Sequence, residues 1–288
     1  MPDLQWLVGD EPMVFGSIPK IMGIVNVTPD SFSDGGKFVE VSAAVDHALK
    51  LIEDGADILD IGGESTRPYS AEVVVAEELK RVVPVIEKLA QQTDVPISID
   101  TSKPIVAQHA VDAGAQIIND VTGMEDEEMI RVAVDRQVAV CAMHMLGTPQ
   151  TMQDDPTYDD VTEEILNHLH ATKVALLEAG IDKRRICLDP GIGFGKTHEH
   201  NLQLIRECDQ FLQLETPILI GHSRKGFVGN IIGDKEADRD VATAAVSLRL
   251  AQCGMHILRV HNVQATRHAL SVFAAIDGLA GFETQTAI

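Results

Sequence analysis

Short apolar runs, each followed directly by polar side chains, recur eight times along this chain. The first, KIMGIVN, ends at Asn26, and the last, ILRVH, ends at His261. Parallel strands place their carboxyl ends on one rim, so residues far apart in sequence can meet there around one small molecule. The polar residues at the run ends are Asn26, Glu64, Thr66, Arg67, Asp100, Asn119, Asp120, His144, Asp189, His222, Ser223, Arg224, Lys225, Arg259 and His261.

Segments with apolar residues at helical spacing separate these runs. Glycine follows several of them at the position that ends a helix, as at Gly55 and Gly114. The stretch Thr101-Ser102-Lys103-Pro104 places a hydroxyl cap just before a proline that suits the first helical turn. The predicted helices cover residues 41–54, 71–92, 104 to about 113, 126–136, 159–179, 199–213, 238–253 and 263–276.

Eight alternations of strand and helix in about 250 residues match the length and order of a (β/α)8 TIM barrel. A doubly wound open sheet is the alternative, but it has fewer strands and collects its ligands at one switch point. Polar ends after every strand favour the closed barrel. We expect residues 1–19 to form a short hairpin over the barrel bottom, and residues 1–288 to form a single domain.

Composition narrows the classes of function. The chain has 288 residues, is 45% hydrophobic, and has a formal net charge of -21 from 44 acidic and 23 basic residues. Such acidity argues against non-specific binding to nucleic acid or to an anionic membrane. The start lacks the features of a signal peptide, the apolar runs are too short to cross a bilayer, and four widely spaced cysteines suggest reduced thiols. We therefore expect a cytoplasmic protein without membrane or nucleic-acid partners.

Four connections that follow strands are long and contain glycine or proline. Long connections in a compact domain usually act as lids or binding loops. We expect this role for residues 27–40, 64–70, 146–158 and 223–237.

Residues 189–197, DPGIGFGKT, invite a nucleotide-binding interpretation that their spacing rejects. A Walker A loop needs glycine where Pro190 stands, and a dinucleotide fingerprint needs glycine where Lys196 stands. The glycines therefore either bring the backbone close to a flat ligand or form a plain tight turn.

Asp100, Asn119 and Asp189 form a more specific signal, because polar groups at the ends of apolar strands are costly unless they bind something. A carboxylate accepts two parallel hydrogen bonds, so the set suits a heterocycle with adjacent amine and ring N–H donors. Helix capping is the alternative for each residue alone. The three together favour a binding site.

Cationic side chains follow the last two strands, in the segments 222–225 (HSRK) and 259–261 (RVH). Late loops of such barrels often bind phosphate. In so acidic a chain, the cluster predicts an anionic substrate that is held locally. A surface salt bridge is the alternative for Arg224 alone.

Between residues 20 and 275, nearly the whole chain resembles dihydropteroate synthase. The segments that carry the resemblance are IMGIVNVTPDSFSDGG, GADILDIGGESTRP, ISIDTSK, IINDVTG, MHMLGTPQTMQ, DPGIGFGKT, GHSRKGF and RVHNV. The resemblance implies a TIM barrel and a transferase of folate biosynthesis. Its reaction joins 4-aminobenzoate to (7,8-dihydropterin-6-yl)methyl diphosphate, which yields 7,8-dihydropteroate and diphosphate. Sulfonamides resemble 4-aminobenzoate and would bind the same site.

The resemblance also implies a role for each matching residue. The pterin would contact Thr66, Asp100, Asn119, Met143, Asp189, Phe194, Lys225 and Arg259. The 4-aminobenzoate would contact Phe32, Thr66, Arg67, Pro68, Ser223 and Lys225. Diphosphate would bind Asn26, Arg259 and His261, with Mg2+ bound through Asn26. The residues implied in catalysis are Asn26, Phe32, Asp34, Lys225, Arg259 and His261.

Two positions depart from the family pattern. Tyr69 stands where the family usually has glycine, which affects the mobility of residues 64–70 and the shape of the aminobenzoate pocket. Asn262 stands where aspartate is common, and either residue can cap the next helix. The alternatives are a pterin-binding methyltransferase and a non-catalytic pterin-binding paralogue. Family members are commonly homodimers, so the resemblance implies a homodimer here.

Overall fold

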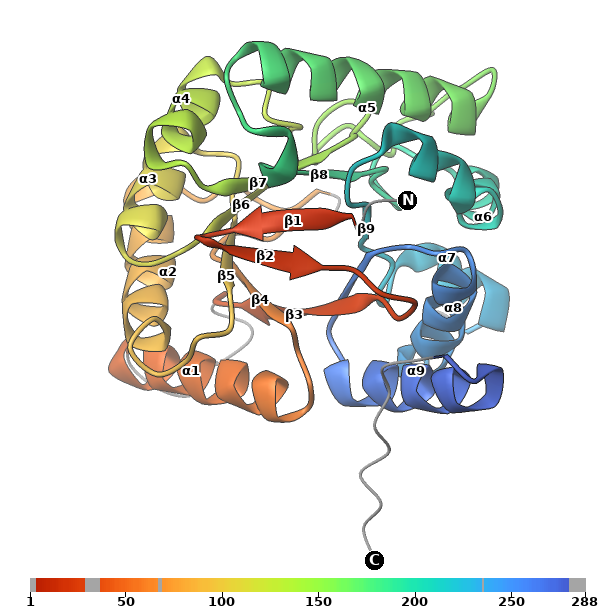
Figure 1. Ribbon diagram of the computed structural model, residues 1–288, viewed down its shortest axis with the longest axis horizontal. Helices are drawn as coiled ribbons and strands as arrows, with labels where there is room; N and C mark the ends of the chain where they lie inside the picture. Colours follow the sequence, from red (N-terminus) through yellow and green to blue (C-terminus); the bar gives the residue numbers. More distant parts are fainter. Residues whose placement is uncertain (1–3, 29–36, 67–68, 235, 280–288) are drawn as a thin grey trace, which may run out of the picture.

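Eight parallel strands form a barrel surrounded by helices in the computed structural model, which describes residues 4–28, 37–66, 69–234 and 236–279 (Figure 1). The barrel strands are β3 (Lys20–Asn26), β4 (Ile58–Gly62), β5 (Ile97–Asp100), β6 (Ile117–Asp120), β7 (Ala139–Met143), β8 (Ile186–Asp189), β9 (Leu219–Ile220) and β10 (Ile257–Val260). The helices of the described ranges are α1 (Lys37–Glu53), α2 (Val75–Leu89), α3 (Pro104–Asp112), α4 (Glu127–Arg136), α5 (Val161–Glu178), α6 (His198–Arg206), α7 (Gly226–Ile232), α8 (Asp240–Gln252) and α9 (Val263–Asp277).

The strands follow one another around the barrel in the order β8-β7-β6-β5-β4-β3-β10-β9. Between β8 and the two-residue strand β9, the ring is joined by a bridge between Leu188 and Ile218. Each of the eight predicted apolar runs is a barrel strand, so the prediction of a (β/α)8 barrel is confirmed.

The barrel interior changes from apolar to polar along the strands, because side chains in a strand alternate between its two faces. Near the strand starts, inward side chains such as Ile58 and Ile257 form one apolar cluster. Two residues further along the same strands stand Asp60 and Arg259, which are bonded to each other. The fold therefore places its buried charge in the half of the barrel nearest the carboxyl ends.

An antiparallel hairpin of β1 (Gln5–Val8) and β2 (Glu11–Val14) lies across the other end of the barrel (Figure 1). Trp6 is fully buried in the apolar cluster at the strand starts, and its indole Nε1 donates to the carbonyl of Arg185 at 3.0 Å. The Arg185 guanidinium in turn donates to the carbonyl of Gly9 at 2.9 Å. The prediction of an N-terminal hairpin over the barrel bottom is confirmed.

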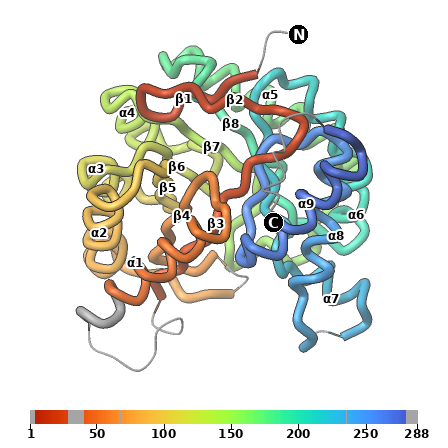
Figure 2. The backbone as a smooth tube through the Cα atoms, turned by 60° about the horizontal axis from the view of Figure 1, so that its bottom comes forward, coloured from red at the N-terminus to blue at the C-terminus, as the bar shows by residue number. Residues whose placement is uncertain are grey.

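Three local predictions were wrong. The segment 223–237 is more than a loop, since it contains α7, which lies at the end of the molecule away from the hairpin (Figure 2). The expected helix 199–213 is divided into α6 and a 3-10 segment, Cys208–Leu214, because the backbone leaves the helical conformation at Glu207. The expected hydroxyl cap is not formed, because no side chain caps α3; the Thr101 hydroxyl donates to Glu78 at 2.7 Å.

Candidate functional site

A cavity of about 1290 Å³ opens where the strands end. Most of the described residues implied in binding line it, namely Asn26, Thr66, Asp100, Phe194, Ser223, Lys225, Arg259 and His261. Three more are buried nearby and do not line it, namely Asn119, Met143 and Asp189. Four predicted site residues lie outside the described residues: Phe32, Asp34, Arg67 and Pro68.

Arg259 joins two strands through its guanidinium. Nε donates to Asp60 Oδ2 at 2.5 Å, and Nη2 donates to Asp100 Oδ2 at 2.6 Å. Although burial opposes it, the carboxylates of Asp60 and Asp100 raise the pKa of Arg259. The guanidinium is therefore a permanent positive charge held in place from two sides.

Asp60 is a site residue that the sequence analysis missed. Its side chain is fully buried, and Asn119 Nδ2 donates to its Oδ2 at 3.2 Å. Asp60 thus positions both Asn119 and Arg259. A signal was present, because a carboxylate stands inside the apolar run ILDIG on the same face as Ile58.

Asp100 has one carboxylate oxygen engaged and one available. Oδ2 accepts from Arg259, whereas Oδ1 is buried and has no hydrogen-bond partner among the described residues. Burial raises the pKa of Asp100 to about 7; Arg259 opposes this rise, and Asp60 is the first of the carboxylates that add to it. A buried acceptor without a partner is costly, so this oxygen suits a ligand N–H donor.

The glycine-rich connection after β8 forms one wall of the cavity. Asp189 Oδ1 accepts from the backbone N–H of Gly191 at 2.7 Å, and burial raises the pKa of Asp189. Lys225 Nζ donates to the carbonyl of Ile192 and lies 4.2 Å from the centre of the Phe194 ring. Burial lowers the pKa of Lys225 to about 7, although the charge of Asp189 opposes this.

Lys196 is almost fully buried and belongs to the same wall. Its Nζ donates to the carbonyl of Phe194 at 2.7 Å and bonds His144 Nδ1 at 3.0 Å. Burial, followed by the charge of Lys196, lowers the pKa of His144 to about 2. His144 is therefore neutral at physiological pH and adds no charge to the rim.

Ser223, which follows β9, and His261, which follows β10, meet at the adjoining part of the cavity wall. The Ser223 Oγ accepts from the backbone N–H of His261 at 3.2 Å, and it lies 3.0 Å from His261 Nδ1. Which of these two atoms donates depends on the tautomer of the imidazole. When Nε2 carries the ring proton, it presents an N–H donor that suits an anion.

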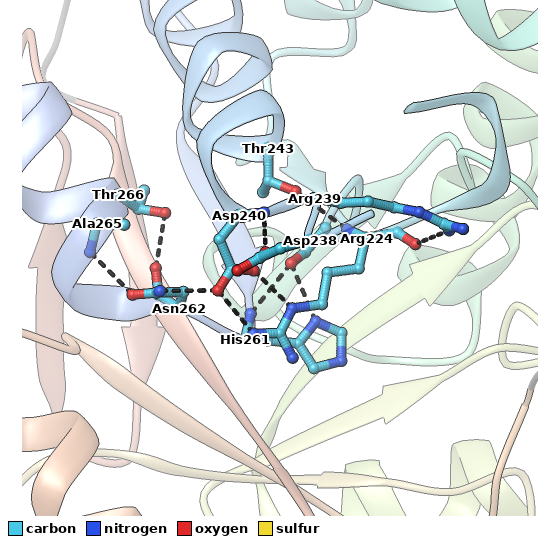
Figure 3. A network of polar contacts seen from close by, with 10 residues as sticks. Arg224, Asp238, Arg239, Asp240, Thr243, His261, Asn262, Ala265 and Thr266 are labelled. Carbon is cyan, nitrogen blue, oxygen red and sulfur yellow. Dashed lines mark hydrogen bonds and ion pairs between the residues drawn. The ribbon is translucent and has the colours of Figure 1, made fainter. Parts of the chain in front are cut away.

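Arg224 and Asn262 belong to a neighbouring surface network (Figure 3). Arg224 makes two bonds to Asp240, with distances of 2.6 and 2.8 Å, so the salt-bridge interpretation of this arginine is confirmed. Asn262 donates to Asp240 at 2.8 Å and accepts from the Ala265 N–H at 2.9 Å. The prediction that Asn262 caps the following helix, α9, is also confirmed.

Tyr69 fastens the connection after β4 to the connection after β7. Its backbone N–H donates to the Pro149 carbonyl at 3.2 Å, and its hydroxyl donates to Asp154 Oδ1 at 3.2 Å. Its φ of 63° lies in the left-handed region that favours glycine. Tyr69 therefore adopts the backbone conformation of a glycine and adds a contact that glycine lacks.

Among the described residues, no group of three His, Cys, Asp or Glu side chains is arranged to hold a metal ion. Within those same ranges, no helix is both long enough and apolar enough to cross a membrane.

Residues 22–261 match the family described as pterin binding enzyme. A dihydropteroate synthase from Escherichia coli (strain K12) is 45% identical over 260 residues, which cover 90% of this chain and 92% of that protein. The match therefore extends over nearly the full length of both proteins.

Solved structures agree with this match. The Xanthomonas albilineans dihydropteroate synthase with 4-aminobenzoic acid is 45% identical, with a TM-score of 0.89 over 96% of this chain and 99% of that one. A second structure of that enzyme, in complex with 7,8-dihydropteroate, is 43% identical, with a TM-score of 0.85 over the same shares. The Yersinia pestis enzyme, solved with a sulfonamide drug, is 40% identical, with a TM-score of 0.89 over 96% of this chain and all of that one.

Proposed function

The chain belongs to the dihydropteroate synthase family of pterin-binding enzymes, and from this premise we propose which residues bind each substrate and take part in catalysis. It is a transferase that condenses (7,8-dihydropterin-6-yl)methyl diphosphate with 4-aminobenzoate to give 7,8-dihydropteroate and diphosphate. The proposal includes the roles of individual residues, the Mg2+ ion, the homodimer and the cytoplasmic location.

The pterin ring binds in the buried half of the barrel mouth. The available Oδ1 of Asp100 and the carboxylate of Asp189 accept from the amine and ring N–H groups, and Asn119 completes the set. Phe194 and Thr66 line the cavity beside the ring, and the buried Met143 would contact the ring from the residues next to it. Lys225, which lies beside the Phe194 ring, donates to the acceptors on the other edge of the pterin.

The diphosphate binds where the barrel mouth is cationic. Arg259 and the Nε2 N–H of His261 meet its oxygens, and Asn26 stands at the end of the neighbouring strand, β3, in the same cavity. An amide oxygen together with substrate phosphates and water is a ligand set that Mg2+ commonly takes. The donor set therefore fits Mg2+ held by Asn26, where the ion would neutralise charge on the leaving diphosphate.

Charge separation along the cavity explains the chemistry. When the bond between the methylene carbon and the diphosphate oxygen breaks, the pterin gains positive charge and the leaving group gains negative charge. Asp100 and Asp189 stabilise the pterin cation, and Arg259 and His261 stabilise the diphosphate. The weakly basic arylamine then needs only correct placement beside the methylene carbon.

The 4-aminobenzoate binds toward the outside of the same cavity. Ser223 and Lys225 follow β9 and supply a hydroxyl and an ammonium group near Thr66. Phe32, Arg67 and Pro68 would contribute from the connections after β3 and β4, and Asp34 would take part in catalysis. Sulfonamides would occupy this part of the site, as compounds that resemble 4-aminobenzoate.

One observation supports these roles most directly: Asp100, whose buried Oδ1 has no hydrogen-bond partner among the described residues, lines a cavity together with cationic residues from the ends of other strands. Calorimetry with a pterin that lacks diphosphate tests it. Asp100→Ala and Asp189→Ala should each weaken binding by about 2–4 kcal/mol, the cost of unpairing buried polar groups. Unchanged pterin affinity in both variants would contradict the proposal that Asp100, Asn119 and Asp189 bind the pterin ring.

Removal of the metal tests the diphosphate site. Excess chelator should abolish turnover, and added Mg2+ should restore it. His261→Ala should lower kcat far more than it weakens binding of the pterin without diphosphate, because the side chain acts on the leaving group. Full activity in chelator would exclude the metal role.

We also propose a cytoplasmic homodimer. All four cysteines are free thiols, which suits a reducing compartment. Five exposed apolar side chains belong to the neighbouring helices α7, α8 and α9, and a second copy of this chain is the proposed partner for them. These side chains are Ile231, Ile232, Val241, Val272 and Ile276. Sedimentation should show a dimer that Val241→Glu dissociates.

A further inference from the structure

A charged cluster lies beneath the connection of residues 64–73, which we call the second loop. Lys103 Nζ donates to Glu64 Oε2 and, at 2.7 Å, to Glu78 Oε2. The Glu78 side chain is fully buried, and its other oxygen accepts from the Thr101 hydroxyl at 2.7 Å. One ammonium thus serves two carboxylates in a place where an unpaired charge would be costly.

The cluster connects Asp100, a proposed pterin-binding residue, to the wall of the cavity. Thr101 directly follows Asp100, and its oxygen also accepts from the backbone N–H of Lys103 at 3.2 Å. Glu64 comes two residues before Thr66, and both residues line the cavity. Lys103 therefore links the end of β5 to the start of the second loop.

Glu64 also holds the return of the same loop. Its Oε1 accepts from the backbone N–H of Val73 at 2.7 Å. Arg81 on α2 donates to the carbonyl of Gly63 at 2.9 Å, which fixes the residue before Glu64. The two ends of the second loop are thus tied together at one carboxylate, whose second oxygen is held by Lys103.

We propose that Lys103 is a positioning residue that holds the base of the second loop and so shapes the pocket for 4-aminobenzoate. The inference rests on the proposed function. Without the ammonium, Glu64 Oε2 and Glu78 Oε2 lose their shared partner, and the two carboxylates repel each other. Glu64 then turns away, releases Val73, and displaces Thr66 from the cavity wall.

The same ammonium balances charge close to Asp100. The charged groups that act on Asp100 come from several elements: Arg259 on β10, Asp60 on β4, Glu78 on α2, Asp120 on β6 and Lys225 before α7. Glu78 is among those that raise the pKa of Asp100. Loss of Lys103 leaves Glu78 uncompensated, so ionisation of Asp100 moves to higher pH.

Lys103→Met, Lys103→Arg and Glu64→Gln test the proposal, with Lys80→Met as the matched control. Lys80 is an exposed lysine of α2 whose partner, Glu77, is 4.0 Å away. The KM for 4-aminobenzoate should rise roughly tenfold or more in Lys103→Met, the effect of losing a charged hydrogen bond, while pterin affinity at pH 8 changes less than about twofold. Lys103→Arg should restore part of the loss, and Lys80→Met should match the wild type.

Glu64→Gln keeps the shape of the side chain and should raise the same KM, without adding to the effect of Lys103→Met in the double variant. It decides the question if Lys103→Met does not fold. Calorimetry can compare the affinity of the same variants for 4-aminobenzoate, with diphosphate and Mg2+ present, without turnover. Binding that changes as expected would support the role of Lys103 even if the proposed reaction were wrong. A KM and an affinity within about twofold of wild type in Glu64→Gln would overturn the proposal.

Discussion

Two buried groups at the cavity have pKa values displaced in opposite directions. Burial raises the pKa of Asp100 to about 7 and lowers the pKa of Lys225 to about 7. In the proposed mechanism, Asp100 accepts hydrogen bonds as a carboxylate and Lys225 donates them as an ammonium. The active form therefore needs one group without its proton and the other with it.

The pH profile of kcat/KM for the pterin substrate should accordingly be bell-shaped, with its maximum near pH 7. Below the maximum Asp100 gains a proton and loses an acceptor, and above it Lys225 loses its charge. Asp100→Asn should remove the acid limb, and Lys225→Arg should remove the alkaline limb because a guanidinium keeps its proton. If the acid limb persists in Asp100→Asn, or the alkaline limb in Lys225→Arg, other groups cause the pH dependence.

For single residues, the sequence showed which polar residues belong to the site, but it did not show which of them bond to each other. Asp100, Asn119 and Asp189 were recognisable because each ends an apolar run. The pairing of Asp100 with Arg259 joins residues 159 positions apart, and only closure of the barrel brings them together. Asp60 was missed because it stands inside its run, where alternation along the strand was the one available signal.

Among the elements, the strands and most helices were predictable, whereas the short helix α7 and the break between α6 and the 3-10 segment were not. α7 contains Gly226 and Gly229, which weaken local helix propensity. A Cβ at Gly229 would lie 3.0 Å from the guanidinium of Arg239, so the glycine makes room for that side chain. Packing between distant residues therefore decides this helix, and local sequence does not reveal it.

Tyr69 supports a prediction at the level of loops. Its hydroxyl bond to Asp154 ties the second loop to the connection after β7, so we expect the proposed aminobenzoate pocket to be partly formed before diphosphate binds. Tyr69→Phe should lower the affinity for 4-aminobenzoate without diphosphate by about twofold to threefold, as expected for one exposed hydrogen bond.

Asp154→Asn should have the same effect as Tyr69→Phe, and the double variant should be no worse than either. Asp155→Asn, one residue further along the same connection, is the control and should match the wild type. Labelled 4-aminobenzoate, titrated with and without diphosphate plus Mg2+, provides the measurement. Equal affinities in wild type and Tyr69→Phe under both conditions would show that the tether does not shape the pocket.

The whole molecule separates its charges by location. The chain has a formal net charge of -21, yet Lys225, Arg259 and His261 line one cavity. The hairpin at the other end contributes apolar packing through Trp6 and leaves the carboxyl ends of the strands to the site. A barrel with one end for stability and the other for chemistry would allow residues from eight strands to take part in a single reaction, as we propose.

The most direct test measures both products of wild-type protein supplied with each substrate alone and with both. The account predicts that diphosphate and 7,8-dihydropteroate appear in equal amounts, and only when the pterin diphosphate, 4-aminobenzoate and Mg2+ are all present. Tight pterin binding without either product, or transfer of a methyl group from a pterin donor, would contradict it.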